Sequence, residues 1–472
     1  MICYNKHSAS PALRRGVPCS EREVQPLYQT TFGRVPGLAS VIGGRMTAPP
    51  TGDDSTLLLR GGCVIDPKNG IHEVRDILIR GGEIAETGCD IRAEKGWTLI
   101  NVSGLQVWPG LIDMHLHLGD LFEVSTEPIA CAARDGVTIG LSPGAGNTFM
   151  APALLGAEVD RGVPISLGVY LGGANVLSTC LTQDELVRLF RGELDPETMA
   201  RKMTRNAITN TTAALAMGIK DHMGHFIMPD ESVDRLFDLT SRAGLIYMSH
   251  TQDPAHAERM VGLSQGRPLH LGHATAAGCG THDSAESGMA RVLDLVGGNV
   301  TAEFVTTMLR PGRGCREGLQ MSPAAQKMAY DALRDGKVRI LVSDGQNEAT
   351  MKGFGDTRDN IPALLELAQM GVLTLDEAVA ALTCHPAALI AERTGCRFFA
   401  EKTGHLGPGA LASITVVEPD RKRAVYTIVN GEIVSFESRL VRRGSGAGGW
   451  VSRFGMLRRT GVGDLAMTAY QD

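Results

Sequence analysis

The 472-residue chain lacks the features that mark several specialised classes of protein. No apolar stretch approaches the roughly 20 residues that a membrane-spanning helix needs, so we expect no membrane contact. The formal net charge of −6 provides no strongly basic surface, which argues against nucleic acid as a partner. A hydrophobic content of 43% is nevertheless enough to build a large core. We therefore expect a globular cytoplasmic protein that binds a small-molecule substrate and can form a homo-oligomer.

Paired cysteines and a dinucleotide-binding motif are also missing. The ten cysteines are scattered and form no Cys-x-x-Cys pair, which excludes a zinc ribbon and a thioredoxin motif. Reduced cysteines of a cytosolic enzyme are the expected state. No Gly-x-Gly-x-x-Gly sequence follows an early strand, and this argues against an open nucleotide-binding sheet.

The two ends of the chain differ in character from its middle. Residues 1–45 are rich in arginine and contain several prolines, so we interpret them as a disordered extension rather than an organellar presequence. Short predicted strands within 46–107 and again within 406–443 indicate one small β-sandwich domain built from both segments. Residues 444–472 begin with a glycine-rich run and are expected to form a flexible tail. The alternative is an arm anchored on a neighbouring subunit by Trp450 and Phe454.

Residues 108–405 alternate predicted strands with predicted helices, the pattern of a parallel α/β sheet. Capping boxes that begin at Thr182 and Thr374 mark the starts of two of these helices. Eight strands fit a (β/α)8 TIM barrel, in which functional residues lie at the C-terminal ends of the strands. The predicted strands are 108–115, 137–142, 164–171, 213–220, 244–250, 267–273, 299–307 and 338–344.

The first predicted barrel strand ends in two histidines. The segment Trp-Pro-Gly-Leu-Ile-Asp-Met-His-Leu-His occupies residues 108–117, so His115 and His117 are separated by one residue. In an extended strand, side chains two residues apart point to the same face. Both imidazoles can then reach one ion, and imidazole is a usual ligand of zinc. The segment therefore predicts a metal site.

Further ligand-type side chains, Lys220, His250, His273 and Asp344, end later predicted strands. His270 lies three residues before His273 and should face another way; spacing alone does not decide which of the two is a ligand. A lysine ammonium has no lone pair, but a buried lysine loses its proton more readily. Its free amine can take up carbon dioxide as a carbamate, which can bridge two metal ions. Together these groups could hold two divalent ions.

The order His-x-His, Lys, His, His, Asp, together with the phrase Pro-Gly-Leu-Ile-Asp-x-His-x-His, resembles the amidohydrolase superfamily. The resemblance is to its binuclear branch, which contains dihydroorotases, hydantoinases, dihydropyrimidinases and isoaspartyl dipeptidases. It covers about residues 55–440 and favours His273 over His270 as the ligand.

The resemblance implies a role for each site residue. His115 and His117 would bind the more buried metal ion. His250 and His273 would bind the second ion. Lys220, as a carbamate, would bridge both ions. Asp344 would contact the first ion and act as the catalytic proton carrier.

A metal-dependent hydrolase of carbon–nitrogen bonds other than peptide bonds is the implied activity, with hydroxide attack on an amide or cyclic amide. Zinc is the expected ion, with manganese, cobalt or iron as alternatives. The alternative is an N-acyl amino acid deacylase or dipeptidase-type hydrolase, in which Arg310 and Arg313 would clamp a substrate carboxylate. Asn347 could hydrogen-bond the substrate amide or ring. Weaker alternatives are a mononuclear deaminase, in which Lys220 has no role, and a non-enzymatic scaffold.

Overall fold

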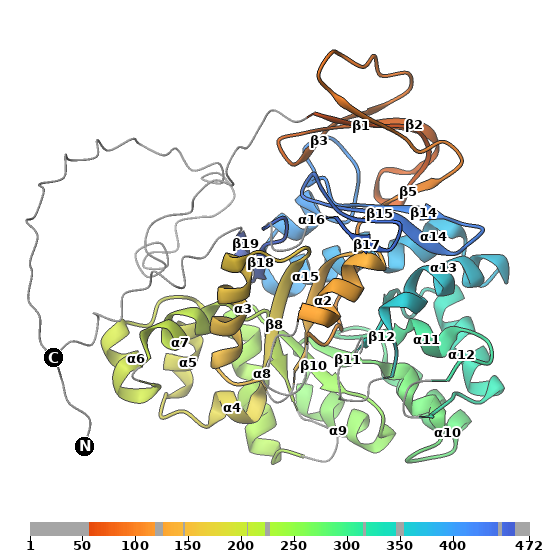
Figure 1. Ribbon diagram of the computed structural model, residues 1–472. Coiled ribbons are helices and arrows are strands. Elements are labelled where there is room, and N and C mark those ends of the chain that lie inside the picture. The colour runs from red at the N-terminus through yellow and green to blue at the C-terminus, as the bar shows by residue number, and fades with distance from the viewer. Residues whose placement is uncertain are drawn as a thin grey trace, which may run out of the picture.

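A parallel barrel forms the larger part of the protein, and a β domain built from the two ends of the chain packs on it (Figure 1). The computed structural model describes residues 56–118, 126–144, 147–204, 206–221, 227–314, 318–345, 354–441 and 446–457. The predicted extension 1–45 and the predicted substrate contact Asn347 lie outside these residues.

Eight parallel strands make the predicted (β/α)8 barrel, and each pairs with the next from β6 to β13. Between the last strand and the first, the barrel closes through a bridge from Leu116 to Gly345 and through Asp113, whose carboxylate accepts from the Ser343 amide at 3.2 Å. The strands are β6 Leu111–Asp113, β7 Val137–Ser142, β8 Ser166–Gly172, β9 Gly218–Lys220, β10 Ile246–His250, β11 Leu269–Gly272, β12 Val300–Val305 and β13 Ile340–Val342.

The segment predicted as one strand over 108–115 is divided between two sheets. β5 (Gln106–Pro109) belongs to the β domain, and β6 belongs to the barrel. At Gly110 between them, the amide donates to the Ser413 carbonyl at 2.8 Å. A Cβ at this position would lie 2.3 Å from Thr138 Oγ1, so the crossing from one sheet to the other requires glycine.

Both ends of the chain contribute to the predicted small β domain. Its described strands form one sheet in the order β17-β16-β15-β14-β5-β1-β2-β3, with β4 paired to β1. Leu59, Val64, Ile79, Ile414 and Val416 are among the residues of its own apolar core. The remaining strands are β1 Leu57–Asp66, β2 Ile71–Arg80, β3 Glu83–Gly88, β4 Thr98–Asn101, β14 Ile414–Glu418, β15 Arg423–Val429, β16 Glu432–Phe436 and β17 Arg439–Leu440.

Part of the predicted flexible tail is a packed hairpin, which corrects the prediction for residues 446–457. Strand β18 (Trp450–Ser452) pairs with β19 (Gly455–Leu457) and with β8 of the same chain. Because β9 has only three residues, it pairs only with the second half of β8. On the same edge of the first half, the Leu167 amide donates to the Gly449 carbonyl at 2.8 Å. Trp450 is fully buried. The hairpin therefore completes the barrel wall.

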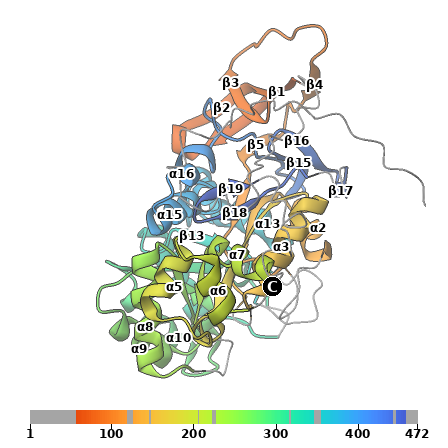
Figure 2. The same ribbon diagram turned by 90° about the vertical axis from the view of Figure 1, so that its left-hand side faces the viewer.

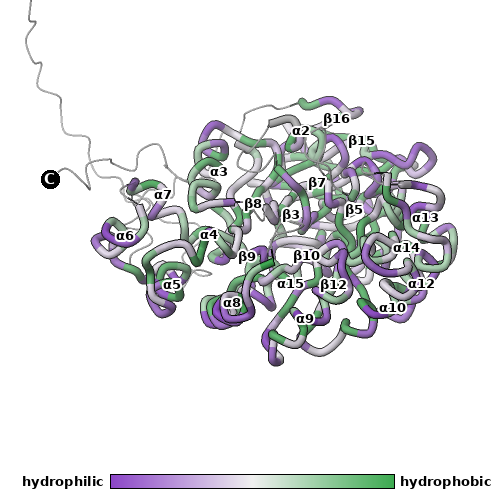
Figure 3. Tube along the Cα trace, turned by 90° about the horizontal axis from the view of Figure 1, so that it is seen from below, coloured by the Kyte–Doolittle hydropathy of each residue, from purple (hydrophilic) through white to green (hydrophobic). Residues whose placement is uncertain are grey.

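Helices surround the barrel, and hydrophilic residues gather on peripheral ones such as α6 and α8 (Figures 2 and 3). The capping boxes predicted at Thr182 and Thr374 are both confirmed. In the part of the chain that the structure describes, none of the helices is long and apolar enough to cross a membrane. The helices are α2 Thr126–Arg134, α3 Met150–Arg161, α4 Gly173–Leu177, α5 Gln183–Phe190, α6 Pro196–Lys202, α7 Ala207–Thr212, α8 Asp230–Ala243, α9 Pro254–Ser264, α10 Ala285–Leu295, α11 Thr306–Leu309, α12 Pro323–Arg334, α13 Asn360–Gln369, α14 Leu375–Ala381, α15 Cys384–Thr394 and α16 Phe398–Lys402.

Candidate metal centre

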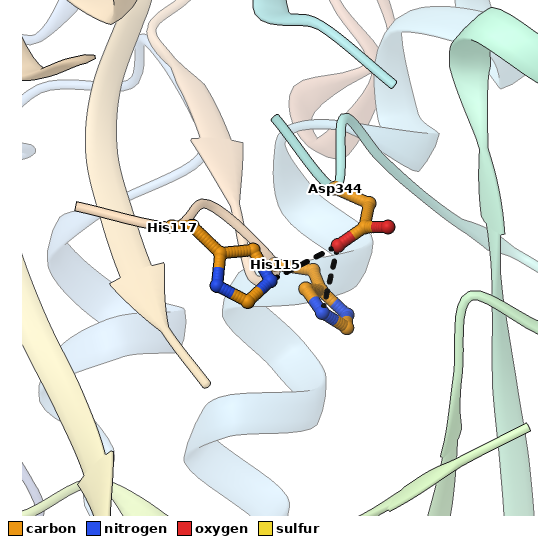
Figure 4. Close-up of side chains that lie close together, drawn as sticks. All are labelled: His115, His117 and Asp344. Carbon is orange, nitrogen blue, oxygen red and sulfur yellow. Dashed lines mark hydrogen bonds and ion pairs between the residues drawn. The ribbon is translucent and has the colours of Figure 1, made fainter. Parts of the chain in front are cut away.

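Three of the predicted ligands meet where β6 and β13 end (Figure 4). Asp344 Oδ1 lies 3.0 Å from Nε2 of His115 and 3.2 Å from Nε2 of His117. Their candidate ligand atoms all lie within 4.8 Å of one another, which is close enough to hold one ion. His115 and Asp344 are buried, and His117 is 18% exposed. One imidazole therefore faces the open end of the barrel.

The two other predicted histidine ligands continue this cluster. The rings of His115 and His273 have centroids 5.1 Å apart, and those of His273 and His250 are 4.5 Å apart. Phe354 covers this second pair, with its ring centroid 4.9 Å from that of His273. Its backbone amide also donates to Asp344 Oδ2 at 2.9 Å. The four imidazoles thus form one continuous group, and Asp344 contacts the first two of them.

Lys220 ends β9 inside this group. Its side chain is buried, and its Nζ has no hydrogen-bond partner among the described residues. A Cβ on Gly272 would lie 3.0 Å from that Nζ, so the glycine makes room for the amine. Burial lowers the pKa of Lys220, although Asp221, Glu303 and Asp344 act in the opposite direction. Burial without a partner among the described residues therefore favours the neutral amine.

Two of the predicted ligands have strained backbones. His273 has φ of 40° and Asp344 has φ of 47°, both in the left-handed region that non-glycine residues seldom adopt. Each follows the last residues of a barrel strand, so the chain turns sharply and directs the side chain inward. Strain of this kind costs of order 1–3 kcal/mol and concentrates at functional sites.

Buried carboxylates that the sequence analysis did not identify hold the ligands. Glu303 on β12 accepts from His115 Nδ1 and from the His273 amide at 3.0 Å. Asp221 accepts from the His250 amide at 3.0 Å, and Asp113 accepts from the His115 amide at 3.2 Å. The contact with Nδ1 of His115 fixes which of its ring nitrogens faces an ion, and the contacts with backbone amides fix the position of the ligand backbone. The signal in the sequence is an acid within an apolar strand, as in Val300–Val305, because carboxylates are seldom fully buried without a partner.

Charges within the cluster determine the protonation of its members. Burial favours neutral His115, but Asp344 and Glu303 outweigh this effect and raise its pKa to about 9. Burial and the neighbouring His250 and Lys220 keep the pKa of His273 well below its ordinary value. Asp344 is buried, yet His115 and His117 hold its pKa well below the usual range. The centre thus contains an ionised carboxylate beside a neutral imidazole, and both are groups that bind divalent metals.

The predicted substrate arginines form ion pairs within the chain. Arg310 Nε and Nη2 each donate to Glu366 at 2.9 Å, and its Nη1 donates to Asp359. Arg313 also contacts Asp359, at 3.2 Å. The structure does not bring either arginine to the histidine cluster. Their charges are compensated by Glu366 on α13 and by Asp359 in the turn before this helix. These ion pairs connect the loop after α11 to α13.

Comparison with known proteins assigns the chain to a family. The amidohydrolase family model matches residues 107–434. Dihydroorotase from Geobacter metallireducens is 27% identical over 414 residues, which cover 80% of this chain and 93% of the relative. Dihydroorotase from Geobacter sulfurreducens is 27% identical over 429 residues, which cover 80% and 99%.

Solved structures share the fold. A D-hydantoinase superposes with a TM-score of 0.62 at 18% identity, covering 85% of this chain and all of the other. Dihydropyrimidinase from Brevibacillus agri superposes with a TM-score of 0.61 at 17% identity, covering 84% and 98%. The family match extends over both the barrel and most of the C-terminal β segment. The chain belongs to the amidohydrolase family.

Proposed function

We propose that this protein is a metal-dependent hydrolase that opens a carbon–nitrogen bond of a cyclic amide. The observation that carries the proposal is the convergence of four imidazoles, Asp344 and Lys220 at the C-terminal ends of the barrel strands. Among the described residues, the Lys220 amine has no hydrogen-bond partner. Barrel enzymes place their chemistry at this face. The curated relatives named dihydroorotase and the solved hydantoinases support a ring amide as substrate.

The donor set fits two divalent ions. His115, His117 and Asp344 would hold one ion, and His250 with His273 would hold the other. Carbamylated Lys220 would supply an oxygen to each. Two buried atoms without partners among the described residues, Lys220 Nζ and His273 Nδ1, support this fit, because buried polar atoms are normally satisfied. Imidazole and carboxylate donors favour zinc.

Bound divalent ions would lower the pKa of a water molecule and polarise the substrate carbonyl. The chain's own residues prepare the proton transfers. The two imidazoles hold Oδ1 of Asp344, and the Phe354 amide holds Oδ2, so the carboxylate keeps one orientation. In that orientation Asp344 would accept a proton from the attacking water and return it to the leaving nitrogen. Phe354 keeps water from one side of His250 and His273.

Hydrolysis of an acyclic, carboxylate-bearing amide is not favoured. That alternative depends on a clamp formed by Arg310 and Arg313, and both guanidinium groups are paired with Glu366 or Asp359. We therefore leave both arginines out of the proposed substrate site.

A substrate panel tests the proposal. Zinc-loaded protein should open dihydroorotate, a 5-substituted hydantoin or a dihydropyrimidine faster than it cleaves any N-acyl amino acid. Asp344→Asn should lower kcat about 10²–10⁴-fold, the range for loss of a general acid–base group. Asp331→Asn on the exposed face of α12 is the matched control and should leave kcat unchanged. Faster cleavage of acyl amino acids, or full activity in Asp344→Asn, contradicts the proposal.

A further inference from the structure

A chain of polar groups runs from His115 toward the other end of the barrel. Glu303 Oε1 accepts from His115 Nδ1, and Glu303 Oε2 lies 3.0 Å from Nε2 of His270. On the far side of its ring, His270 Nδ1 lies 2.9 Å from Thr301 Oγ1. His270 and Glu303 are both completely buried. Because His270 and Glu303 are buried, each depends on neighbouring groups of the protein for its hydrogen bonds.

The geometry of the strands aligns this chain. Thr301 and Glu303 are two residues apart on β12 and therefore face the same side, toward the barrel interior. β11 pairs with β12 in parallel, with His270 opposite Thr301. The imidazole thus lies directly between the hydroxyl and the carboxylate.

The contacts of Glu303 decide which ring nitrogen of His115 faces the metal centre. Oε1 of Glu303 contacts Nδ1 of His115, and Oε2 contacts Nε2 of His270. His115 is then obliged to present Nε2 toward Asp344, 3.0 Å away.

We propose that His270 is a positioning residue of the metal centre, which holds Glu303 so that Glu303 presents His115 Nε2 to the ion. This inference rests on the metal site proposed above. Without the donor from His270, Glu303 Oε2 loses the bond that fixes the carboxylate plane. The same carboxylate accepts from the His273 amide, so its rotation disturbs the ring of His115 and the backbone of His273.

Two substitutions separate positioning from packing. The side-chain nitrogen of glutamine reaches about as far from the backbone as Nε2 of histidine, whereas that of asparagine reaches about as far as Nδ1. His270→Gln therefore keeps a donor for Glu303, and His270→Asn keeps only a partner for Thr301. We expect His270→Asn to raise the zinc dissociation constant about 10–100-fold, which is the range for loss of a group that orients a metal ligand. His270→Gln should stay within about threefold of wild type.

Zinc affinity is measured by competition with a chelator, and the metal-free proteins are unfolded in urea in parallel. A role in packing alone changes the unfolding midpoint and leaves the zinc dissociation constant of the folded protein unchanged. His385→Asn is the matched control. His385 lies on α15, and its Nδ1 contacts the Arg339 carbonyl at 3.0 Å rather than a group of the metal centre. It should bind zinc as wild type does.

Three outcomes overturn the inference. They are wild-type zinc affinity in His270→Asn, a tenfold weaker affinity in folded His270→Gln, and equal losses in both variants. The second outcome can be observed even if His270→Asn does not fold. Wild-type protein that binds no zinc refutes the proposed function itself, and this result is distinct from the other three.

Discussion

Replacement of Trp450 by alanine should destabilise the whole barrel, because this side chain seals its wall. Trp450 is fully buried and begins the strand that pairs with β8. Loss of a buried tryptophan side chain costs about 3–5 kcal/mol. Its indole N–H has no hydrogen-bond partner in the described residues, so phenylalanine loses volume but no bond. We expect Trp450→Phe to cost about 1–2 kcal/mol.

Urea unfolding measures the loss in the free energy of unfolding for both variants. We would follow it by far-ultraviolet circular dichroism, because both substitutions remove a tryptophan and so change the fluorescence signal. Trp97→Ala in the β domain is the control, since Trp97 is only partly buried. It should cost less than Trp450→Ala. A loss below about 1 kcal/mol in Trp450→Ala would mean that residues 446–457 do not support the barrel, and would refute the reasoning.

The other predictions concern a buried acid, a close backbone contact and the arginine pairs. Burial raises the pKa of Asp135 from 3.8 to about 7, so the folded state binds more protons than the unfolded state between these values, and stability falls as pH rises through them. The free energy of unfolding of Asp135→Asn, measured in urea relative to wild type, should therefore rise by about 2–3 kcal/mol between pH 5 and pH 8. A difference that stays constant with pH contradicts this prediction. Gly355→Ala places a Cβ 2.1 Å from the Ser343 carbonyl, next to Asp344. It should lower the free energy of unfolding by about 1–3 kcal/mol and weaken zinc binding in a chelator titration. Unchanged affinity and stability would show that the contact is absent. Arg310→Ala should lower the free energy of unfolding by about 1–3 kcal/mol, because it removes the ion pairs with Glu366 and Asp359. Arg313→Ala should leave KM for a cyclic amide within about twofold of wild type. A large rise in KM would place Arg313 in the substrate site.

The barrel was predictable because local patterns and general topology agree. The predicted strand 137–142 coincides with β7, and most others are within about two residues of the observed bounds. Strand ends in a parallel barrel share one face, so His250, His273 and Asp344 could be expected together although they lie far apart in the sequence. The capping boxes are equally local signals.

What escaped prediction depends on contacts between distant residues. The crossing at Gly110 depends on a carbonyl at Ser413, and the hairpin at Trp450 depends on the shortness of β9. A glycine-rich run before Trp450 is typical of a linker, and nothing in it reveals the edge of β8 that β9 leaves open. The arginine loop was assigned to substrate because its partners, Asp359 and Glu366, follow it by about fifty residues.

Metal content per chain in wild-type protein and in Lys220→Ala, both produced with bicarbonate, tests the central claim most directly. The amine of Lys220 is buried and has no hydrogen-bond partner within the described part of the chain. If it forms the proposed carbamate, that group should join two ions. We predict about two ions per wild-type chain and a clear loss in Lys220→Ala. A single ion that is unaffected by the substitution, or no metal in protein purified without chelator, would contradict the account.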